Sequence, residues 1–169
     1  MTEPRITLVI GHAASGKSAF AEAAAGEAGL PRTYVATARL WDDEMRAKAR
    51  DHAARRGPDW TLVETPPDLA SACAGASGAV LVDCATLWLT GLSMDGQDWA
   101  APAEAWIAAM RANAGARFWV VSNDVGGGIT PEGPMARRFQ RDQGALNQRL
   151  AAAADAVVLV TAGLPQVLK

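Results

Sequence analysis

The most specific chemical pattern in the chain is an octapeptide that runs from Gly11 to Ser18. Its sequence, GHAASGKS, fits the phosphate-binding pattern G-x-x-x-x-G-K-[ST] at every fixed position. Glycines let the backbone N–H groups wrap around a phosphate chain, and the helix that follows adds the positive end of its dipole. We therefore predict that a nucleoside triphosphate is bound by Gly11, His12, Ala13, Ala14, Ser15, Gly16, Lys17 and Ser18.

Two residues of this loop and one acidic residue farther along predict how the triphosphate is handled. Lys17 is expected to reach the β- and γ-phosphates, and the hydroxyl of Ser18 to hold Mg²⁺. Asp83 ends the apolar run GAVLV and is the second expected magnesium ligand, although an aspartate there could equally cap a helix. Kinases, switches and motors share this loop, so the pattern does not choose among them.

A second candidate site lies on a predicted helix over residues 41–56. Acidic residues fill its first turn, basic residues its last, and a Gly-Pro pair ends it. Spacings of three and four residues place Lys48, Arg55 and Arg56 on the same face as His52. A neutral imidazole is a competent nucleophile toward phosphorus, and cations neutralise charge on phosphate oxygens. The other interpretation is a solvated surface helix that carries one histidine.

His12 competes with His52 for the role of nucleophile because it lies within the phosphate loop itself. Its other interpretation is a loop side chain that faces solvent. The chain has two histidines in all, so replacing each in turn separates these hypotheses.

The elements that must position these residues form an alternating pattern. Short apolar runs alternate with helix-forming stretches, which predicts a mostly parallel sheet covered on both faces, a three-layer α/β/α sandwich. The length of 169 residues predicts a single domain over residues 1–169. Segments 64–70, 91–102 and 124–134 contain Pro, Gly and Asp and are predicted to be connections. The predicted strands are Ile6–Ile10, Tyr34–Ala36, Thr61–Val63, Ala79–Val82, Phe118–Val121 and Val157–Val160.

Composition excludes several classes of protein. Half of the residues are hydrophobic and the formal net charge is −2, which is typical of a globular protein and gives no basic surface for nucleic acid. Two histidines and two separated cysteines make neither a four-ligand zinc site nor a thiol redox pair. No stretch approaches the ~20 apolar residues that span a bilayer, and no leader pattern is seen. We therefore expect a cytoplasmic protein with no membrane span.

Taken together, the motifs resemble one known family. The phosphate loop is followed by YVATA at 34–38, by DDEM at 42–45 with His52 seven positions after the Met, and by SNDVGGGITPE at 122–132. RFQRD at 138–142, NQRL at 147–150 and AGLP at 162–165 continue the match toward the C-terminus. This order of motifs is similar to that of the bifunctional adenosylcobinamide kinases/adenosylcobinamide-phosphate guanylyltransferases of cobalamin biosynthesis.

The resemblance implies two reactions. ATP or GTP would phosphorylate the hydroxyl of adenosylcobinamide, and GTP would then pass GMP through a guanylylated histidine to adenosylcobinamide phosphate, giving adenosylcobinamide-GDP. Family members are P-loop proteins of RecA-like fold, assemble as homotrimers and bind a corrinoid substrate. Carried over by position, His52 corresponds to the guanylylated histidine, and the further nucleotide-binding positions are Ala36, Thr37, Ala38, Ala53, Ala54, Arg55, Arg56, Glu64 and Asp83.

The chain departs from the family pattern in three places. The family loop commonly has the sequence GGxRSGKS, whereas His12 replaces the second Gly and Ala14 replaces the Arg. The lost cation removes one phosphate contact, for which Arg55 and Arg56 could compensate. Asp83 stands where some members have Glu, and the segment 91–102 is compact where other members are longer.

Two other functions are compatible with the phosphate loop alone. The first is a single-activity P-loop kinase of a small molecule, in which His52 has no catalytic role. The second is a nucleotide-dependent switch without catalytic turnover. A covalent GMP adduct distinguishes the bifunctional enzyme from both.

Overall fold

The computed structural model describes residues 3–29, 31–39, 43–64 and 68–169. Its strands form one seven-stranded sheet in the order β3-β2-β4-β5-β1-β6-β7. β1 to β6 pair in parallel, and β7 pairs antiparallel with β6. The strands are β1 (Ile6–Gly11), β2 (Arg32–Ala36), β3 (Trp60–Glu64), β4 (Gly78–Asp83), β5 (Ala116–Asn123), β6 (Ala156–Thr161) and β7 (Leu164–Val167).

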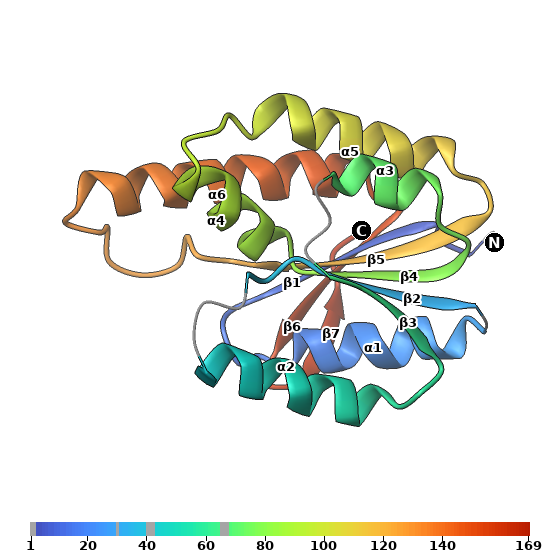
Figure 1. Ribbon diagram of the computed structural model, residues 1–169. Coiled ribbons are helices and arrows are strands. Elements are labelled where there is room, and N and C mark those ends of the chain that lie inside the picture. The colour runs from blue at the N-terminus through green and yellow to red at the C-terminus, as the bar shows by residue number, and fades with distance from the viewer. Residues whose placement is uncertain (1–2, 30, 40–42, 65–67) are drawn as a thin grey trace.

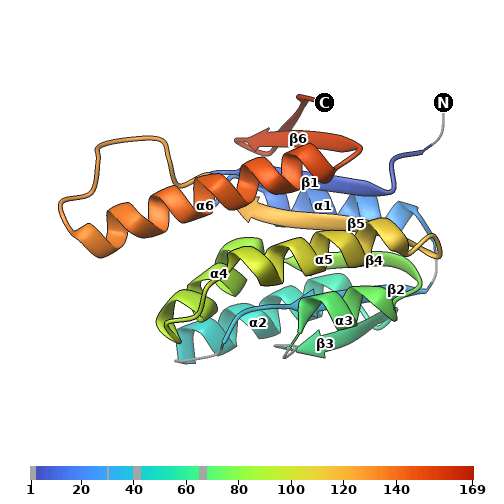
Figure 2. The same ribbon diagram turned by 90° about the horizontal axis from the view of Figure 1, so that it is seen from above.

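Helices cover both faces of this sheet (Figure 1). α1 and α2 lie on one face, and α3, α4, α5 and α6 lie on the other, as the view from above in Figure 2 also shows. The predicted three-layer α/β/α sandwich with a mostly parallel sheet is confirmed. The helices are α1 (Lys17–Glu27), α2 (Asp43–Arg56), α3 (Leu69–Ala74), α4 (Ala85–Met94), α5 (Ala100–Ala112) and α6 (Pro134–Ala153).

Each face of the sheet has its own buried core. On the side of α3 to α6, Trp106 and Phe118 are among the largest fully buried side chains. On the side of α1, Ala21 and Ala25 have no exposed surface and pack against strand residues that include Trp119. A sheet buried on both faces needs strands that are apolar along their whole length, which is why the buried central strands β1, β4 and β5 could be predicted from short continuous apolar runs.

All six predicted strands are confirmed, one further strand was missed, and three predicted connections were too long. β7 was not predicted because its residues are exposed and include Pro165. Such a segment lacks the apolar run that indicates a buried strand, and proline within a sheet is confined to edge positions. The predicted connections 64–70 and 91–102 are shorter: α3 begins at Leu69, α4 continues to Met94 and α5 begins at Ala100. The loop predicted over 124–134 is confirmed as far as Gly133, since Pro134 is the first residue of α6. Residues 41 and 42 of the predicted helix, and residues 65–67, lie outside the described residues.

Parallel pairing brings the predicted site residues to one edge of the sheet. Ala36 at the end of β2 stands in register with Glu64 on β3 and with Asp83 on β4. Gly11 at the end of β1 stands in register with Asn123 on β5. In open α/β sheets, ligands bind outside the carboxyl ends of the strands, so this edge is where the fold places a site.

None of the described helices is long and apolar enough to cross a membrane.

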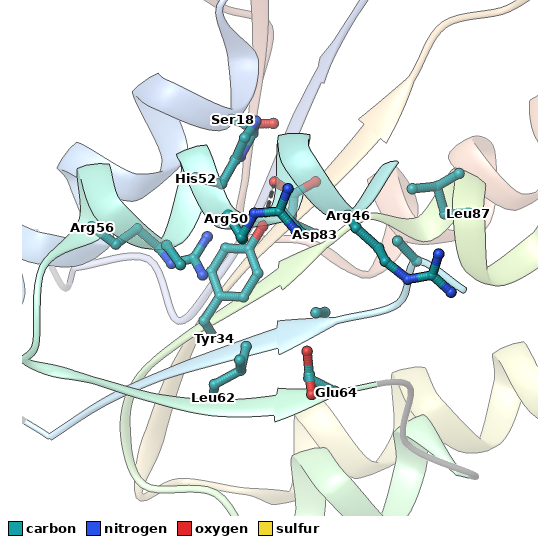
Figure 3. A pocket seen from close by; sticks show the side chains of 14 residues that line it. Ser18, Tyr34, Arg46, Arg50, His52, Arg56, Leu62, Glu64, Asp83 and Leu87 are labelled. Atoms are coloured by element: carbon teal, nitrogen blue, oxygen red, sulfur yellow. Dashed lines mark hydrogen bonds between the residues drawn. The ribbon is translucent and has the colours of Figure 1, made fainter. Parts of the chain in front are cut away.

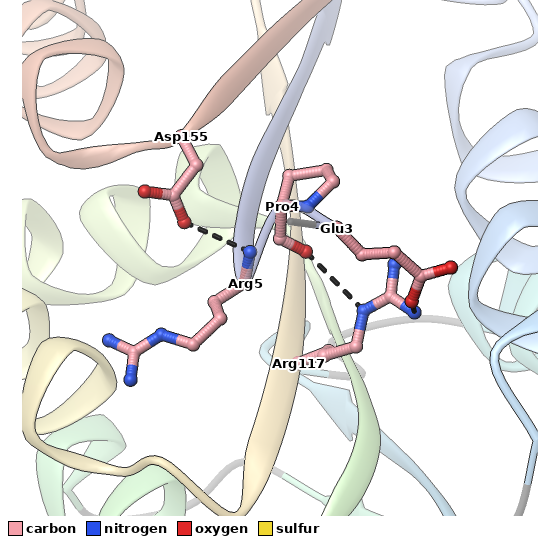
Figure 4. Close-up of polar contacts among 5 residues, drawn as sticks. All are labelled: Glu3, Pro4, Arg5, Arg117 and Asp155. Carbon is pink, nitrogen blue, oxygen red and sulfur yellow. Dashed lines mark hydrogen bonds and ion pairs between the residues drawn. The ribbon is translucent and has the colours of Figure 1, made fainter. Parts of the chain in front are cut away.

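Polar contacts at the opposite end of the sheet fix the start of β1. The backbone N–H groups of Arg5 and Ile6 both donate to Asp155 Oδ2, each at 2.9 Å. Arg117 Nε donates to the carbonyl oxygen of Pro4 at 3.3 Å (Figure 4). The hydrogen bond from Ile6 is the main cause that lowers the pKa of the Asp155 carboxyl. The ionised carboxylate therefore joins the start of β1 to that of β6.

We expect Asp155→Ala to lower the free energy of unfolding by about 1 kcal/mol, the net value of hydrogen bonds at a largely solvated group. Because the pKa of Asp155 is lowered in the folded state, its contribution should be present at neutral pH and lost as the pH falls through that folded-state value. Urea unfolding of both proteins at pH 7 and at acidic pH measures this. An equal difference at both pH values would contradict the assignment.

Candidate functional site

The phosphate loop has the backbone geometry that its sequence predicts. Gly16 caps α1 with a φ of +92°, a left-handed conformation that favours glycine. At Gly11 the limit is space, since a Cβ would lie 2.5 Å from the carbonyl oxygen of Val160 and 2.6 Å from Ser15 Oγ. The N–H of Gly163, in the turn between β6 and β7, donates to the carbonyl oxygen of Ser15 at 2.8 Å. The β6–β7 turn therefore supports the phosphate loop from outside.

Lys17 is held inside the loop. Its side chain Nζ donates to the carbonyl oxygen of His12 at 3.0 Å, and only 8% of the residue is exposed. Burial lowers the pKa of Lys17, while the neighbouring Cys84 and Asp83 raise it. An ammonium group has three donors, so two remain for phosphate oxygens.

His12 lies at the rim of the loop and contacts another segment. Its Nδ1 is 3.0 Å from the carbonyl oxygen of Asp124, and because a carbonyl only accepts, Nδ1 carries the hydrogen. A Cβ at Gly127 would lie 3.1 Å from His12 Cε1. His12 is exposed, as its solvent-facing interpretation predicted, and it also joins the phosphate loop to the loop at 124–133.

Asp83 is fixed from two sides. The hydroxyl of Tyr34 donates to Asp83 Oδ2 at 3.0 Å, and burial of Tyr34 is the largest cause that raises the pKa of this phenol. Thr37 Oγ1 donates to the carbonyl oxygen of Cys84 at 2.7 Å and accepts from the Cys84 N–H at 2.8 Å. The peptide bond between Asp83 and Cys84 is cis. Thr37, a predicted nucleotide-binding residue, thus uses its hydroxyl within the protein.

On α2, His52 and Arg56 face an acidic residue of α1. His52 Nδ1 is 3.8 Å and Arg56 Nη1 is 3.9 Å from Glu22 Oε1. Arg56 also lies over the ring of Tyr34, with its Cζ 3.5 Å from the ring centroid. Only 6% of the Arg56 side chain is exposed, yet its Nη1 makes no hydrogen bond within the described part of the chain. A buried guanidinium nitrogen without an acceptor is suited to an anionic ligand.

These groups surround one cavity of about 720 Å³ between α2 and the carboxyl edge of β2, β3 and β4 (Figure 3). Ser18 from the phosphate loop, Asp83 from β4 and His52 from α2 all line it. The volume lies within the usual range for small-molecule sites. The predicted site residues that line the cavity are Ser18, Ala36, Ala38, His52, Ala53, Arg56, Glu64 and Asp83.

Some predicted site residues are not in the cavity wall. Residues 11–17 form the adjoining phosphate loop, and neither Thr37 nor Ala54 contributes to the wall. The side chains of Lys48 and Arg55 lie outside the described part of the structure.

Other residues of the cavity were missed by sequence reasoning. The wall that α2 forms also includes Arg46, Ala49 and Arg50, which were not predicted. Arg46 and Ala49 lie six and three residues before His52, and Arg50 lies three residues before Ala53, so helical spacing from the predicted residues would have found them. Tyr34 begins the YVATA segment but was not predicted to line the site, and Leu62 and Leu87 lie in no motif. Glu22, whose Oε1 is 3.8 Å from His52 Nδ1, was also not predicted.

The donors at the phosphate loop fit a magnesium ion. The hydroxyl of Ser18 and the carboxylate of Asp83 border the same cavity, and Mg²⁺ takes oxygen ligands, usually a few from protein and the rest from phosphate and water. Among the described residues no cluster of three or more His, Cys, Asp or Glu forms a metal site by itself.

Comparison with known proteins identifies relatives along nearly the whole chain. Residues 7–168 match the model of a family described as "Cobinamide kinase / cobinamide phosphate guanyltransferase". A protein of Pseudomonas aeruginosa named "Bifunctional adenosylcobalamin biosynthesis protein CobP" is 40% identical over 167 residues, 96% of each chain. A Salmonella typhimurium protein named "Bifunctional adenosylcobalamin biosynthesis protein CobU" is 39% identical over 176 residues, 93% of this chain and 96% of the relative.

Solved structures with little sequence identity share the fold. The flagellar accessory protein FlaH from Methanocaldococcus jannaschii superposes with a TM-score of 0.54 at 10% identity, covering 98% of this chain and 78% of FlaH. The P4 protein of bacteriophage phi6, solved in complex with ADP, gives a TM-score of 0.50 at 16% identity, covering 96% of this chain and 54% of P4. These likenesses support the predicted P-loop, RecA-like α/β fold.

We expect Thr37→Val to lower the free energy of unfolding by about 1–3 kcal/mol, because the buried N–H of Cys84 would lose its hydrogen bond, and its carbonyl oxygen would keep only the one from the Trp88 N–H. Thr37→Ser keeps the hydroxyl and is the matched control. Chemical denaturation measures the difference between the two variants. Equal stability would show that these hydrogen bonds do not fix the end of β4.

Proposed function

Because the chain belongs to the cobinamide kinase / cobinamide phosphate guanyltransferase family, we propose that one cavity serves both of its reactions and that His52 is the residue that receives GMP. The observation that carries this proposal is that Ser18, Asp83 and His52 line the same cavity. A domain of 169 residues has room for one such site, and a covalent histidine intermediate lets one nucleotide site serve two acceptors. The substrates are GTP or ATP and the corrinoids adenosylcobinamide and its phosphate.

In the kinase reaction the acceptor is the hydroxyl of the cobinamide side chain. Its oxygen forms a bond to the γ-phosphorus and loses its proton to solvent water, the bond from that phosphorus to the bridging oxygen breaks, and the nucleoside diphosphate leaves with the electron pair of that bond. Lys17 and the backbone N–H groups of residues 11–18 hold the β- and γ-phosphates. Ser18 and Asp83 would hold Mg²⁺, which neutralises charge on the phosphate oxygens.

In the guanylyl transfer the acceptor is first His52 and then cobinamide phosphate. Arg56 lies one helical turn after His52, and with Arg46 and Arg50 it gives the cavity wall on α2 a positive charge. These cations would stabilise the negative charge that develops on the α-phosphate and on the departing pyrophosphate. They also supply the cation that the phosphate loop lacks at Ala14. Glu64 would accept a hydrogen bond from guanine or from a ribose hydroxyl.

The assembly and location proposed for the protein follow the family resemblance. We propose a homotrimer in the cytoplasm, with residues 1–169 as one domain and no nucleic-acid partner. Both cysteines are buried and free, which suits a reducing compartment. Ile129 and Met135, exposed to 96% and 80%, are apolar side chains that a subunit contact would cover. Sedimentation velocity of the purified protein tests the trimer.

Incubation with Mg²⁺ and GTP labelled at the α-phosphate should leave acid-labile, base-stable label on the polypeptide, with the mass of one GMP. We expect His52→Ala to abolish the adduct, because no nucleophile remains, whereas His12→Ala should retain it. Intact-protein mass spectrometry reads both results. Label that persists in His52→Ala and disappears in His12→Ala would assign the nucleophile to His12. Phosphoryl transfer without any adduct would instead support the single-activity kinase. If neither phosphoryl transfer nor an adduct is found, the result would support a nucleotide-dependent switch.

Lys17→Met should lower the rate of phosphoryl transfer to adenosylcobinamide by roughly 100-fold or more, the scale of losing one preorganised electrostatic contact. The substitution keeps the length of the side chain and removes its charge. Corrinoid phosphorylation measured by chromatography provides the rate. Arg117→Met, at the opposite end of the sheet, is the control and should leave that rate unchanged.

A further inference from the structure

Glu22 joins the helix of the phosphate loop to the helix that carries His52. It lies on α1 four residues after Ser18, on the same face one turn along. Its side chain is 10% exposed, and its Oε1 is 3.8 Å from Nδ1 of His52. That separation lies within ion-pair range and exceeds a hydrogen bond, and catalytic hydrogen bonds commonly shorten when substrate binds.

The position of this carboxylate selects between the two ring nitrogens of His52. An ionised carboxylate only accepts hydrogen bonds, so it favours the ring form in which Nδ1 carries the hydrogen. Nε2 then holds the lone pair. Carboxylates that orient a functional histidine through its second nitrogen act in this way in many sites.

We propose that Glu22 is a positioning residue for the guanylyl transfer, which rests on the proposed role of His52. The Nε2 lone pair of His52 forms a bond to the α-phosphorus of GTP, and the bond from that phosphorus to the bridging oxygen breaks as pyrophosphate leaves with its electron pair. Nδ1 keeps its proton, so the ring becomes a cation that faces the Glu22 carboxylate. In the return step a phosphate oxygen of the cobinamide bonds to phosphorus, the N–P bond breaks and its electrons return to Nε2.

Glu22 also faces Arg56, which allows a purely structural alternative. Arg56 Nη1 is 3.9 Å from the same oxygen, and the guanidinium is buried against Tyr34. If Glu22 served only to neutralise Arg56, its loss would weaken the binding of GTP and leave the ring of His52 unaffected. The two roles therefore predict different ring forms of His52, that is, a different ring nitrogen that carries the hydrogen.

Nitrogen NMR of protein labelled with ¹⁵N-histidine reads that property directly. The chain has two histidines, so the spectrum contains two rings, and His12→Gln assigns them. We expect the wild-type His52 to carry its hydrogen on Nδ1, and Glu22→Met, which matches the length but has no acceptor oxygen, to shift it toward Nε2. Glu22→Asp should restore part of the wild-type pattern. Glu27→Met, at an exposed position of the same helix, is the control and should change nothing.

The rate of GMP adduct formation provides the second measurement. Glu22→Met should slow it by roughly 10- to 100-fold, the range observed when a carboxylate that orients a histidine is removed, with little change in the affinity for GTP. If Glu22→Met does not fold, Glu22→Gln is measured in its place. An unchanged ring form and rate, or a change in GTP affinity alone, would overturn the inference. Failure of the wild type to form an adduct would overturn the proposed function instead, because the NMR measurement needs no nucleotide.

Discussion

The parallel pairing of β2 with both β3 and β4 is the constraint on which the site depends. Because these strands run in one direction, their carboxyl ends meet, and Glu64, Ala36 and Asp83 stand side by side in register. A shift of one residue would turn every side chain of β2 to the other face of the sheet. Tyr34 would then lose Asp83, and Arg56 would lose the ring on which it lies. The buried apolar faces of the strands therefore fix the chemistry as well as the fold.

The helix opposite this row of residues is held differently. The exposed residues of α2 include Arg46, Arg50 and Ala53, all of which also line the cavity. Among the side chains of α2 that the structure describes, His52 and Arg56 lie within ion-pair range of Glu22 of α1, and Arg56 lies over the ring of Tyr34. The proposed nucleophile is therefore linked through Glu22 to α1, the helix that follows the phosphate loop.

Local sequence determined the parts of the structure that depend on local physics. The loop at 11–18 could be predicted because a phosphate loop needs glycine, lysine and serine at fixed spacing. The central strands could be predicted because burial on both faces requires apolar runs, whereas the edge strand β3, with exposed and half-buried residues, was found from its β-favouring residue types. The roles of Glu22 and Tyr34 could not be predicted, because Glu22 lies in no motif and the YVATA segment that Tyr34 begins does not show what its hydroxyl binds. Glu22 acquires a role only when α2 packs beside α1, and Tyr34 only when β2 pairs with β4. Likewise, Thr37 was predicted to bind the nucleotide, whereas its hydroxyl makes hydrogen bonds to the backbone of Cys84.

The central position of β1 has a consequence for how the chain reaches its native state. β1 pairs with β5 and β6, and the contact between His12 and Asp124 joins residues 112 positions apart. Contacts so distant in sequence slow folding, because a long loop must close before they form. During synthesis the strand that leads into the phosphate loop emerges early and has no sheet partner until β5 follows. Its unpaired backbone N–H and C=O groups and its apolar faces are then exposed to misassociation until β5 and β6 pair with it.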